Sequence, residues 1–344
     1  MAGTYKNILV SSVNWLGDVI FSTPVFRNIK QNCPGARVSC LAVPRVAEIL
    51  ECCPDVDEIL VYEEKGRHRG LLGKGSIIRE LRRRKFDAAF FLRPSLSRAT
   101  LAWAAGIPAR IGTARKGRWF LTSSVEPLPE DRHRSDQYLG LLEGIGWTVP
   151  DRTCRLAVPA PAGKSVRSLL SSKGIEDTDR IAVFHVGGNW DLKRWPRENF
   201  VPVAEGLQAR SLRVVISGGK GDAPDAEWIS GRSGRRPVVL AGQTDLKQLL
   251  ALMDRASVVI SADSGPLHLA SAAGTPVVGI FGPTRPEVTG PRGAGRCEPL
   301  INDVGCNRAP CYYLECPDNV CMKSVKPDDV LQAAFRCLDG RRPV

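Results

Sequence analysis

The sequence of 344 residues contains no apolar run long enough to span a bilayer, although 43% of its residues are hydrophobic. A membrane-crossing helix needs about 20 such residues, so no transmembrane segment is expected. The first residues lead directly into the strand-like segment 8–10, without the basic stretch and long apolar segment of a secretory signal peptide. These absences predict a cytoplasmic protein.

Two further features of the composition exclude classes of protein. The eleven cysteines are odd in number and belong to a long chain without a signal segment, which argues against a secreted disulfide framework. Aromatic residues make up only 6%, and no helix-turn-helix, zinc-finger or RNA-stacking motif stands out. We therefore expect no nucleic-acid partner.

Positive charge is abundant, and it is unevenly distributed. Within the net charge of +12, residues 1–175 carry 27 Lys and Arg against 16 Asp and Glu, whereas residues 176–344 carry 21 against 20. A basic surface attracts anionic lipid, nucleic acid or a phosphorylated substrate. For any single arginine, the alternative that its charge serves only solubility stays open.

Strand-like and helix-like segments alternate along the whole chain. The strand-like segments are 8–10, 38–43, 58–62, 88–92, 181–186, 212–217, 257–261 and 277–281, and the main helix-like segments are 18–30, 46–52, 77–84, 199–209 and 244–253. Strands separated by helices with short connections imply βαβ units and parallel sheets. The sequence therefore predicts an α/β fold with two doubly wound, Rossmann-like halves.

The Pro- and Ala-rich segment 158–163 is the best candidate for a linker between these halves. We expect an N-terminal domain at 1–165, a C-terminal domain at 166–325, and a helical tail at 326–344. Two such domains facing each other form a cleft, and ligands of parallel sheets bind beyond the carboxyl ends of the strands. The loops 11–18, 185–195, 217–221 and 261–268 are therefore the expected binding loops.

Three of these loops carry side chains suited to chemistry. Asp18 follows the first strand, where it either caps the next helix or serves as a general base at the cleft. Gly187 and Gly188 follow a strand, allow a close approach of backbone to ligand, and precede the cations Lys193 and Arg194. An ordinary solvated loop is the alternative there. The dinucleotide-binding GxGxxG and the P-loop patterns are absent from these loops.

The most informative stretch is 263–276, between two apolar segments. It predicts a strand, a polar turn and a short helix, whose N-terminal N–H groups and dipole favour an anion. Ser264 and Gly265 are expected to bind phosphate oxygens, and His268 lies one helical turn beyond Ser264. Asp263 as a helix cap and His268 as a buried structural histidine are the alternatives. We infer a nucleotide diphosphate as the ligand.

Taken together, these stretches resemble the ADP-heptose:lipopolysaccharide heptosyltransferases, the inverting enzymes of glycosyltransferase family 9. The matching residues are Gly17 and Asp18 with Thr23 and Pro24; Lys193 to Pro196 with Phe200; Gly218 and Gly219; Ala241 and Gly242; Asp263 to Ala270; Gly274 to Pro276; and Phe281 to Thr284. The cysteine-rich tail and residues 136–139 favour the subfamily that transfers the second heptose.

The resemblance implies a GT-B fold, ADP-L-glycero-D-manno-heptose as donor, and a phosphorylated, heptosylated Kdo-lipid A core as acceptor. It implies Asp18 as the catalytic base, no cofactor and no catalytic metal. It also implies a place at the cytoplasmic face of the inner membrane, with peripheral membrane contact. The residues that it assigns to the donor are Gly188, Asn189, Lys193, Thr244, Asp263, Ser264, Gly265 and His268.

Basic residues of the first half suit an acceptor that carries phosphates and lipid. The expected acceptor contacts are Arg67, Arg69, Arg115 and Arg118. The cluster 82–85 reads instead as a solvated helix end.

The cysteines at the end of the second half recur every five residues, at Cys306, Cys311, Cys316 and Cys321. Four evenly spaced thiols suggest a structural zinc site, although the spacing is at the long edge of the usual range. An iron–sulfur site would lack the ferredoxin spacing. A reduced, loop-rich segment is the alternative.

Two other functions remain open at this stage. One is a family 9 transferase with a different sugar or acceptor, and the other is a non-catalytic module that binds anionic lipid or nucleic acid. ADP binding in the C-terminal domain separates the transferase from the module.

Overall fold

A computed structural model describes residues 5–114, 117–188, 190–306, 308, 311 and 315–340. Its contacts divide the chain into two compact units, residues 1–156 (unit 1) and 157–344 (unit 2). The boundary expected after residue 165 falls inside helix α6 (Ala160–Ser172). Pro161 lies in the first turn of α6, where its missing N–H breaks no helical hydrogen bond, so the supposed linker begins a helix instead.

Unit 1 contains a six-stranded parallel sheet in the order β3-β2-β1-β4-β5-β6. Its elements are β1 (Asn7–Ser11), α1 (Leu16–Asn32), β2 (Arg37–Ala42), α2 (Pro44–Leu50), β3 (Glu58–Val61), α3 (Gly70–Arg84), β4 (Ala88–Phe91), α4 (Leu96–Ala104), β5 (Ala109–Thr113), the 3₁₀ turn η1 (Arg118–Phe120), β6 (Ser123–Val125) and α5 (Arg134–Glu143).

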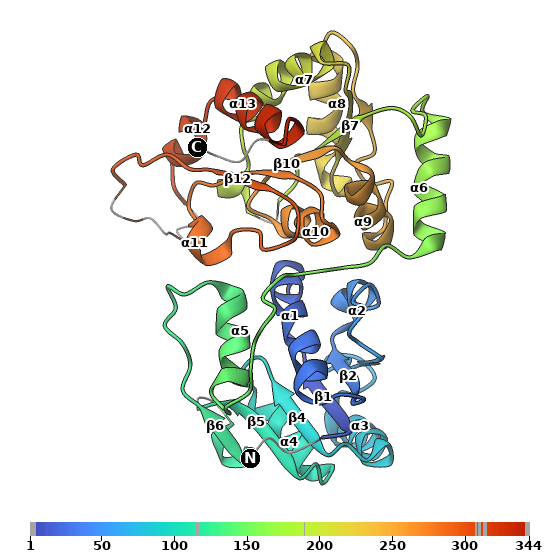
Figure 1. The fold of residues 1–344 in the computed structure, drawn as a ribbon, viewed down its shortest axis with the longest axis vertical. Coiled ribbons are helices and arrows are strands. Elements are labelled where there is room, and N and C mark those ends of the chain that lie inside the picture. The colour runs from blue at the N-terminus through green and yellow to red at the C-terminus, as the bar shows by residue number, and fades with distance from the viewer. Residues whose placement is uncertain are drawn as a thin grey trace. The chain divides into compact units, whose positions relative to one another are not determined.

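The central strands of unit 1 are apolar on both faces because helices cover both faces. All four residues of β4 are buried, and β1 is buried from Ile8 to Ser11. One face packs against α3 and α4 through Ile77, Leu81 and Leu101. The helices α1 and α5 pack together on the other face (Figure 1).

Unit 2 repeats this architecture with a six-stranded parallel sheet in the order β12-β11-β10-β7-β8-β9. After α6, its elements are β7 (Ile181–His185), η2 (Asp191–Lys193), η3 (Arg197–Asn199), α7 (Phe200–Ala209), β8 (Arg213–Ser217), η4 (Lys220–Asp222), α8 (Ala223–Arg232), β9 (Val238–Val239), α9 (Leu246–Arg255), β10 (Val258–Ala262), α10 (Gly265–Ala273), β11 (Val277–Ile280), α11 (Pro286–Thr289), β12 (Cys297–Leu300), α12 (Val320–Ser324) and α13 (Pro327–Leu338).

The helix α13 belongs to the core of unit 2 and is not a separate tail. Val330, Ala333, Ala334 and Cys337 are buried in the same cluster as residues of α7 and of the central strands. The indole N–H of Trp195 donates to the carbonyl of Val325 (3.0 Å), which ties the entry of α13 to the body of the unit. Figure 1 shows α13 beside α7 on one face of this sheet.

In each sheet the strand order reverses beside the first strand of the unit. The reversal lies between β1 and β4 in unit 1, and between β7 and β10 in unit 2. In doubly wound folds the ligand binds beyond the carboxyl ends of the strands at this switch point. Of the helices that the structure describes, none is long and apolar enough to cross a bilayer.

Candidate active site

In unit 1, Asp18 lies in a pocket of about 260 Å³ at the switch point of the sheet. The pocket also contains Arg93 and Pro94, which directly follow β4, and Thr113 at the end of β5. Asp18 occupies the first turn of α1, and Trp15 rather than Asp18 is the N-cap residue. Asp18 is therefore not the residue that caps this helix.

Helix α5 supplies the partners of the Asp18 carboxylate. The Tyr138 hydroxyl donates to Oδ1 of Asp18 (3.0 Å), and Nε of Arg134 lies 3.8 Å from the same oxygen. Burial and the neighbouring carboxylate hold the pKa of Tyr138 well above its usual value, so Tyr138 stays a donor at neutral pH. Asp18 keeps a quarter of its side-chain surface exposed. The carboxylate is thus oriented by two groups and still open to the pocket.

A buried arginine fixes the loop that leads to Asp18. Arg98 of α4 donates to the carbonyl of Ser12, to Oγ of Ser11 (3.2 Å) and to Oδ1 of Asn14 (2.9 Å). Burial lowers the pKa of Arg98, although a guanidinium stays charged under all ordinary conditions. Three hydrogen bonds from one planar group hold the β1–α1 loop in a single geometry.

Of the expected acceptor residues, Arg67, Arg69 and Arg118 do not line this pocket. Arg67 and Arg69 lie between β3 and α3, Arg118 lies in η1, and Arg115 falls outside the described residues. The cations that line it are Arg93 and Arg134. No local motif predicts a role for these two arginines. Arg93 lies in the β4–α4 loop and Arg134 at the start of α5, and only the topology of the sheet brings these two segments together.

In unit 2, Lys193 and Asp263 meet at the second switch point. The Lys193 ammonium lies 2.7 Å from Oδ2 of Asp263, and His268 Nε2 lies 3.3 Å from Oδ1. The hydroxyls of Thr284 (2.6 Å) and Thr289 (3.2 Å) also donate to Oδ2. The sequence identified the first three residues, whereas the two threonines were missed as partners.

The charge of Asp263 is stabilised by these neighbours despite its burial. Only 3% of its side chain is exposed, and desolvation alone would raise its pKa. The hydrogen bond from His268 and the positive charge of Lys193 outweigh desolvation and lower the pKa well below its ordinary value. Lys193, with 22% of its side chain exposed, is the one member of the pair that reaches solvent.

Helix α10 begins with Gly265, directly after Asp263 and Ser264. Oγ of Ser264 lies 3.1 Å from Oγ of Ser261, and His268 of the same helix is turned to Asp263. His268 therefore pairs with the Asp263 carboxylate, and a joint approach of Ser264 and His268 to one ligand stays a prediction. The first turn of α10 directly follows Asp263 and Ser264, and Asp263 holds the Lys193 ammonium.

A second network joins the two glycine turns of unit 2. Arg194 donates to the carbonyl of Gly188 (3.0 Å) and forms an ion pair with Asp222 (2.8 Å). Asp222 accepts from the N–H of Gly219 (2.7 Å), so one carboxylate and one guanidinium connect the loops after β7 and β8. An added Cβ at Gly187 would stand 2.2 Å from Oδ2 of Asp222, so a larger residue there would displace this bonded carboxylate. Asn189 falls outside the described residues.

Thr244 and His185 border the same edge of the sheet. The N–H of Gly242 donates to the carbonyl of Gly218 (2.8 Å), which brings the loop of Thr244 beside the glycine turn after β8. His185 is buried at the end of β7, with Nδ1 3.1 Å from Oγ of Ser217. Burial lowers the pKa of His185 to about 4, so the imidazole is neutral at physiological pH.

The four evenly spaced cysteines differ in their exposure. Cys306 is exposed, and Cys311, Cys316 and Cys321 are half-buried. Within the described part of the chain, no three His, Cys, Asp or Glu side chains converge closely enough to hold a metal ion. Burial raises the pKa of the Cys321 thiol, and the nearby Cys311 and Cys316 raise it further. A structural metal at these four cysteines therefore stays a prediction.

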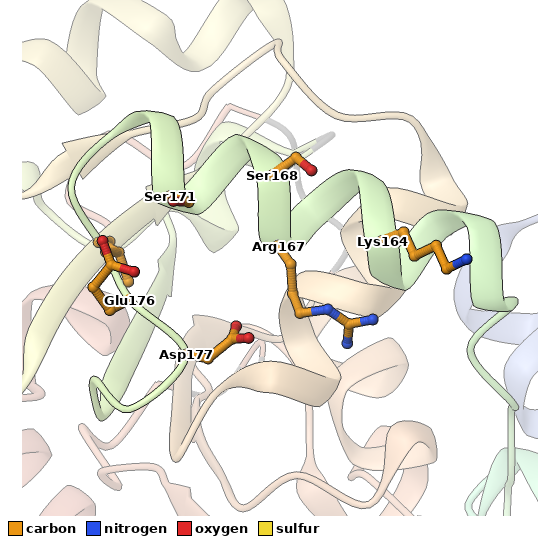
Figure 2. Close-up of a pocket in the computed structure, with 7 residues that line it drawn as sticks. Lys164, Arg167, Ser168, Ser171, Glu176 and Asp177 are labelled. Atoms are coloured by element: carbon orange, nitrogen blue, oxygen red, sulfur yellow. The ribbon is translucent and has the colours of Figure 1, made fainter.

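A separate hollow lies beside α6, lined by Lys164, Arg167, Ser168, Ser171, Ile175, Glu176 and Asp177 (Figure 2). Residues 175–177 precede β7, so the hollow borders the amino end of the strand. The catalytic candidates of unit 2 follow the carboxyl ends. The hollow is therefore not part of the candidate site.

Two curated relatives resemble this chain over most of its length. Lipopolysaccharide heptosyltransferase 3 of Escherichia coli K12 is 28% identical over 282 residues, which cover 78% of this chain and 80% of that protein. Lipopolysaccharide heptosyltransferase 2 of Salmonella typhimurium LT2 is 27% identical over 301 residues, with coverage of 83% and 85%.

Solved structures resemble it over nearly the whole chain. The crystal structure of the glycosyl transferase family 9 from Veillonella parvula DSM 2008 is 26% identical, with 99% of both chains covered and a TM-score of 0.86. The E. coli ADP-heptose lps heptosyltransferase II is 22% identical, covers 97% of this chain and 99% of its own, and has a TM-score of 0.79, a likeness of fold. The predicted GT-B fold class is confirmed.

The family model for glycosyltransferase family 9 (heptosyltransferase) matches residues 75–316, which is more than half of the chain. This span includes every residue that lines the unit 1 pocket except Asp18, and the whole Lys193–Asp263 cluster. The chain therefore belongs to glycosyltransferase family 9, the heptosyltransferases, and is an enzyme.

Proposed function

We propose that the protein transfers L-glycero-D-manno-heptose from ADP-heptose to a phosphorylated Kdo-lipid A core that already carries one heptose. Unit 1 then binds the acceptor in the Asp18 pocket, and unit 2 binds the donor at the Lys193–Asp263 cluster. The names of the relatives support a lipopolysaccharide core heptosyltransferase. The position of the added heptose rests on the cysteine-rich tail and residues 136–139.

The chemistry follows from the two clusters. The acceptor hydroxyl attacks the anomeric carbon of the heptose, the bond from that carbon to the diphosphate oxygen breaks, and the configuration inverts. Asp18 accepts the hydroxyl proton during the attack. The Lys193 ammonium and the N–H groups at the start of α10 stabilise the negative charge that develops on the departing ADP.

The observation that carries this assignment is the orientation and partial exposure of the Asp18 carboxylate. A base needs a carboxylate that is oriented and reachable, and Asp18 is held by Tyr138 and Arg134 while part of its surface stays open to a pocket with cationic walls. Arg93 and Arg134 suit phosphates of the acceptor. Gly188, Asn189, Thr244, Ser264, Gly265 and His268 remain the proposed donor contacts beside Lys193 and Asp263.

Replacement of Asp18 by asparagine tests the base. The change keeps the shape of the side chain and removes the proton acceptor, so turnover is expected to fall about 10²–10⁴-fold. ADP affinity is expected to stay within about twofold, because the donor cluster belongs to unit 2. Asp136→Asn, which removes a carboxylate of α5 paired with Arg152 outside the pocket, is the matched control. Near-normal turnover of Asp18→Asn overturns the assignment.

The acceptor is tested with defined cores that bear zero, one or two heptoses. Transfer to the core with one heptose is expected to be the fastest. A preference for another core corrects the position of transfer, whereas transfer of a different sugar from its ADP derivative favours another family 9 activity. We further propose that the enzyme works at the cytoplasmic side of the inner membrane, where a lipid-anchored acceptor is available.

A further inference from the structure

One surface of unit 1 combines large exposed apolar side chains with cations. We call it the α3–α4 face. Its apolar members are Leu71, Leu72, Leu96, Trp103 and Trp119, and its basic members are Arg69, Lys74, Arg79, Arg83 and Arg118. Leu71, Leu72 and Trp119 are 90%, 91% and 88% exposed, values that a side chain with a role in the core would not have.

The two leucines are displayed on a rigid support. The inner side of α3 consists of Gly73, Ile77 and Leu81, which recur every four residues and leave Leu71 and Leu72 outside that stripe. A Cβ added at Gly73 would stand 2.5 Å from the backbone of His68, so the helix packs directly on the preceding loop. The backbone contact orients the start of α3 and presents the leucines to solvent.

The second apolar group lies on α4 and η1, which pack together. The rings of Trp103 and Phe120 are 5.6 Å apart in an edge-on arrangement. Gly117, which precedes η1, approaches the backbone of Leu96 so closely that a Cβ there would stand 3.2 Å from its Cα. The C-terminal ends of α3 and α4 are joined by a hydrogen bond from Arg82 to the carbonyl of Ala104 (2.7 Å). Both groups thus belong to one layer of the unit (Figure 1).

This layer is predominantly basic. From residue 65 to residue 125 the sequence has 15 Lys and Arg, and its only acidic residues are Glu80 and Asp87. Among the described residues, none of the five basic members of the α3–α4 face forms an ion pair. A shallow hollow on α3 is lined by Arg79, Arg82 and Arg83 with Ser76 and Glu80, which suits an anionic headgroup.

We propose that the α3–α4 face docks on an anionic phospholipid surface. Leu71, Leu72 and Trp119 enter the interfacial layer, and the cations contact headgroup phosphates. A second copy of the chain fits this face poorly, because a twofold contact between identical faces would bring like charges together. The inference deepens the proposed function and rests on it, since a lipid-anchored acceptor is met at a bilayer.

Sedimentation of the full-length protein with vesicles tests the proposal. Vesicles of equal parts phosphatidylglycerol and phosphatidylcholine are expected to bind it, and vesicles of phosphatidylcholine alone are expected to bind far less. Replacing Lys74, Arg79 and Arg83 by glutamine weakens binding about fivefold per cation, hence about 100-fold. Replacing Leu71 and Leu72 by serine weakens it about tenfold or more.

The matched control removes three exposed cations, Lys164 and Arg167 of α6 and Lys173 at its C-cap (Figure 2 shows the first two). These changes alter net charge equally and are expected to affect vesicle binding less than threefold. Equal losses in the two triple variants would show general electrostatic attraction and overturn the assignment of the face. The assignment of the face is also overturned if the leucine variant binds vesicles normally, or if this variant changes only the oligomeric state in gel filtration.

Transfer to a water-soluble, delipidated core separates this proposal from the proposed function. Variants of the α3–α4 face are expected to retain wild-type turnover on the soluble acceptor and to lose it on acceptor embedded in vesicles. Absence of transfer by the wild-type protein on both acceptors refutes the function, while vesicle binding would still be measured. Equal loss of transfer by the leucine variant on both acceptors refutes the docking role.

Discussion

Removing the ammonium of Lys193 leaves a buried carboxylate without its cation, and the consequence for stability follows from the structure. In Lys193→Met, Asp263 keeps the hydroxyls of Thr284 and Thr289 and the imidazole of His268. Breaking a buried pair from one side costs about 3–5 kcal/mol. With three polar partners left, we expect the lower end, about 3 kcal/mol.

Thermal unfolding followed through the tryptophans measures this loss. For a unit of this size about 3 kcal/mol corresponds to a decrease in Tm of roughly 6–12 °C. Adding Asp263→Asn removes the unpaired charge, so the double variant is expected to recover at least half of the loss. The single variant Asp263→Asn should be milder than Lys193→Met, because the partly exposed ammonium of Lys193 can turn to water.

The pH dependence supplies a second check, and its sign is fixed by the lowered pKa of Asp263. A carboxyl whose folded pKa is depressed contributes stability above its unfolded pKa and loses it as pH falls through the folded value. Without Lys193 the folded pKa rises, so the variant is at its greatest disadvantage near neutral pH. The gap to wild type then narrows on acidification, as protonation removes the unpaired charge. An unchanged Tm of Lys193→Met, or a double variant no more stable than it, would refute this reasoning.

Three further outcomes are expected. Tyr138→Phe removes the hydrogen bond that orients Asp18, so kcat/KM should fall about 10–100-fold with unchanged ADP affinity, whereas a normal rate would exclude an orienting role. Burial lowers the pKa of His185 to about 4, so stability should decline by up to ~3 kcal/mol as pH falls from about 6.5 to 4, and His185→Gln should flatten this decline. Since no three His, Cys, Asp or Glu side chains of the described residues are placed to hold a metal ion, metal analysis of purified protein should find no stoichiometric zinc; one zinc per chain would contradict this.

The sequence predicted the fold class and the residues that lie in local, patterned stretches. Alternating apolar segments identified most of the strands, because strands buried on both faces are nearly all apolar. Lys193, Asp263 and His268 were found because each follows or lies near the carboxyl end of such a strand. The pairing of His268 with Asp263 was not foreseen, since helical spacing describes neighbours on one helix and not the carboxylate that precedes it.

Residues that approach the site from distant parts of the chain were missed. Tyr138 lies 120 positions from Asp18, and only the packing of α5 on α1 brings them together. Arg98 was overlooked because its partners are two serines and an asparagine near Asp18, a set without a motif. The segment 158–163 was predicted to be a linker, whereas it contains the start of α6. Proline is common both in linkers and in the first turn of a helix.

The position of α13 has a consequence for synthesis of the chain. All strands and helices of unit 1 precede residue 157, so this unit is able to fold while the rest is still being made. Unit 2 lacks part of its interior until Val330 to Cys337 have emerged from the ribosome. A nascent chain, or one truncated before α13, would thus possess the proposed proton acceptor Asp18 before the proposed donor unit has its complete core.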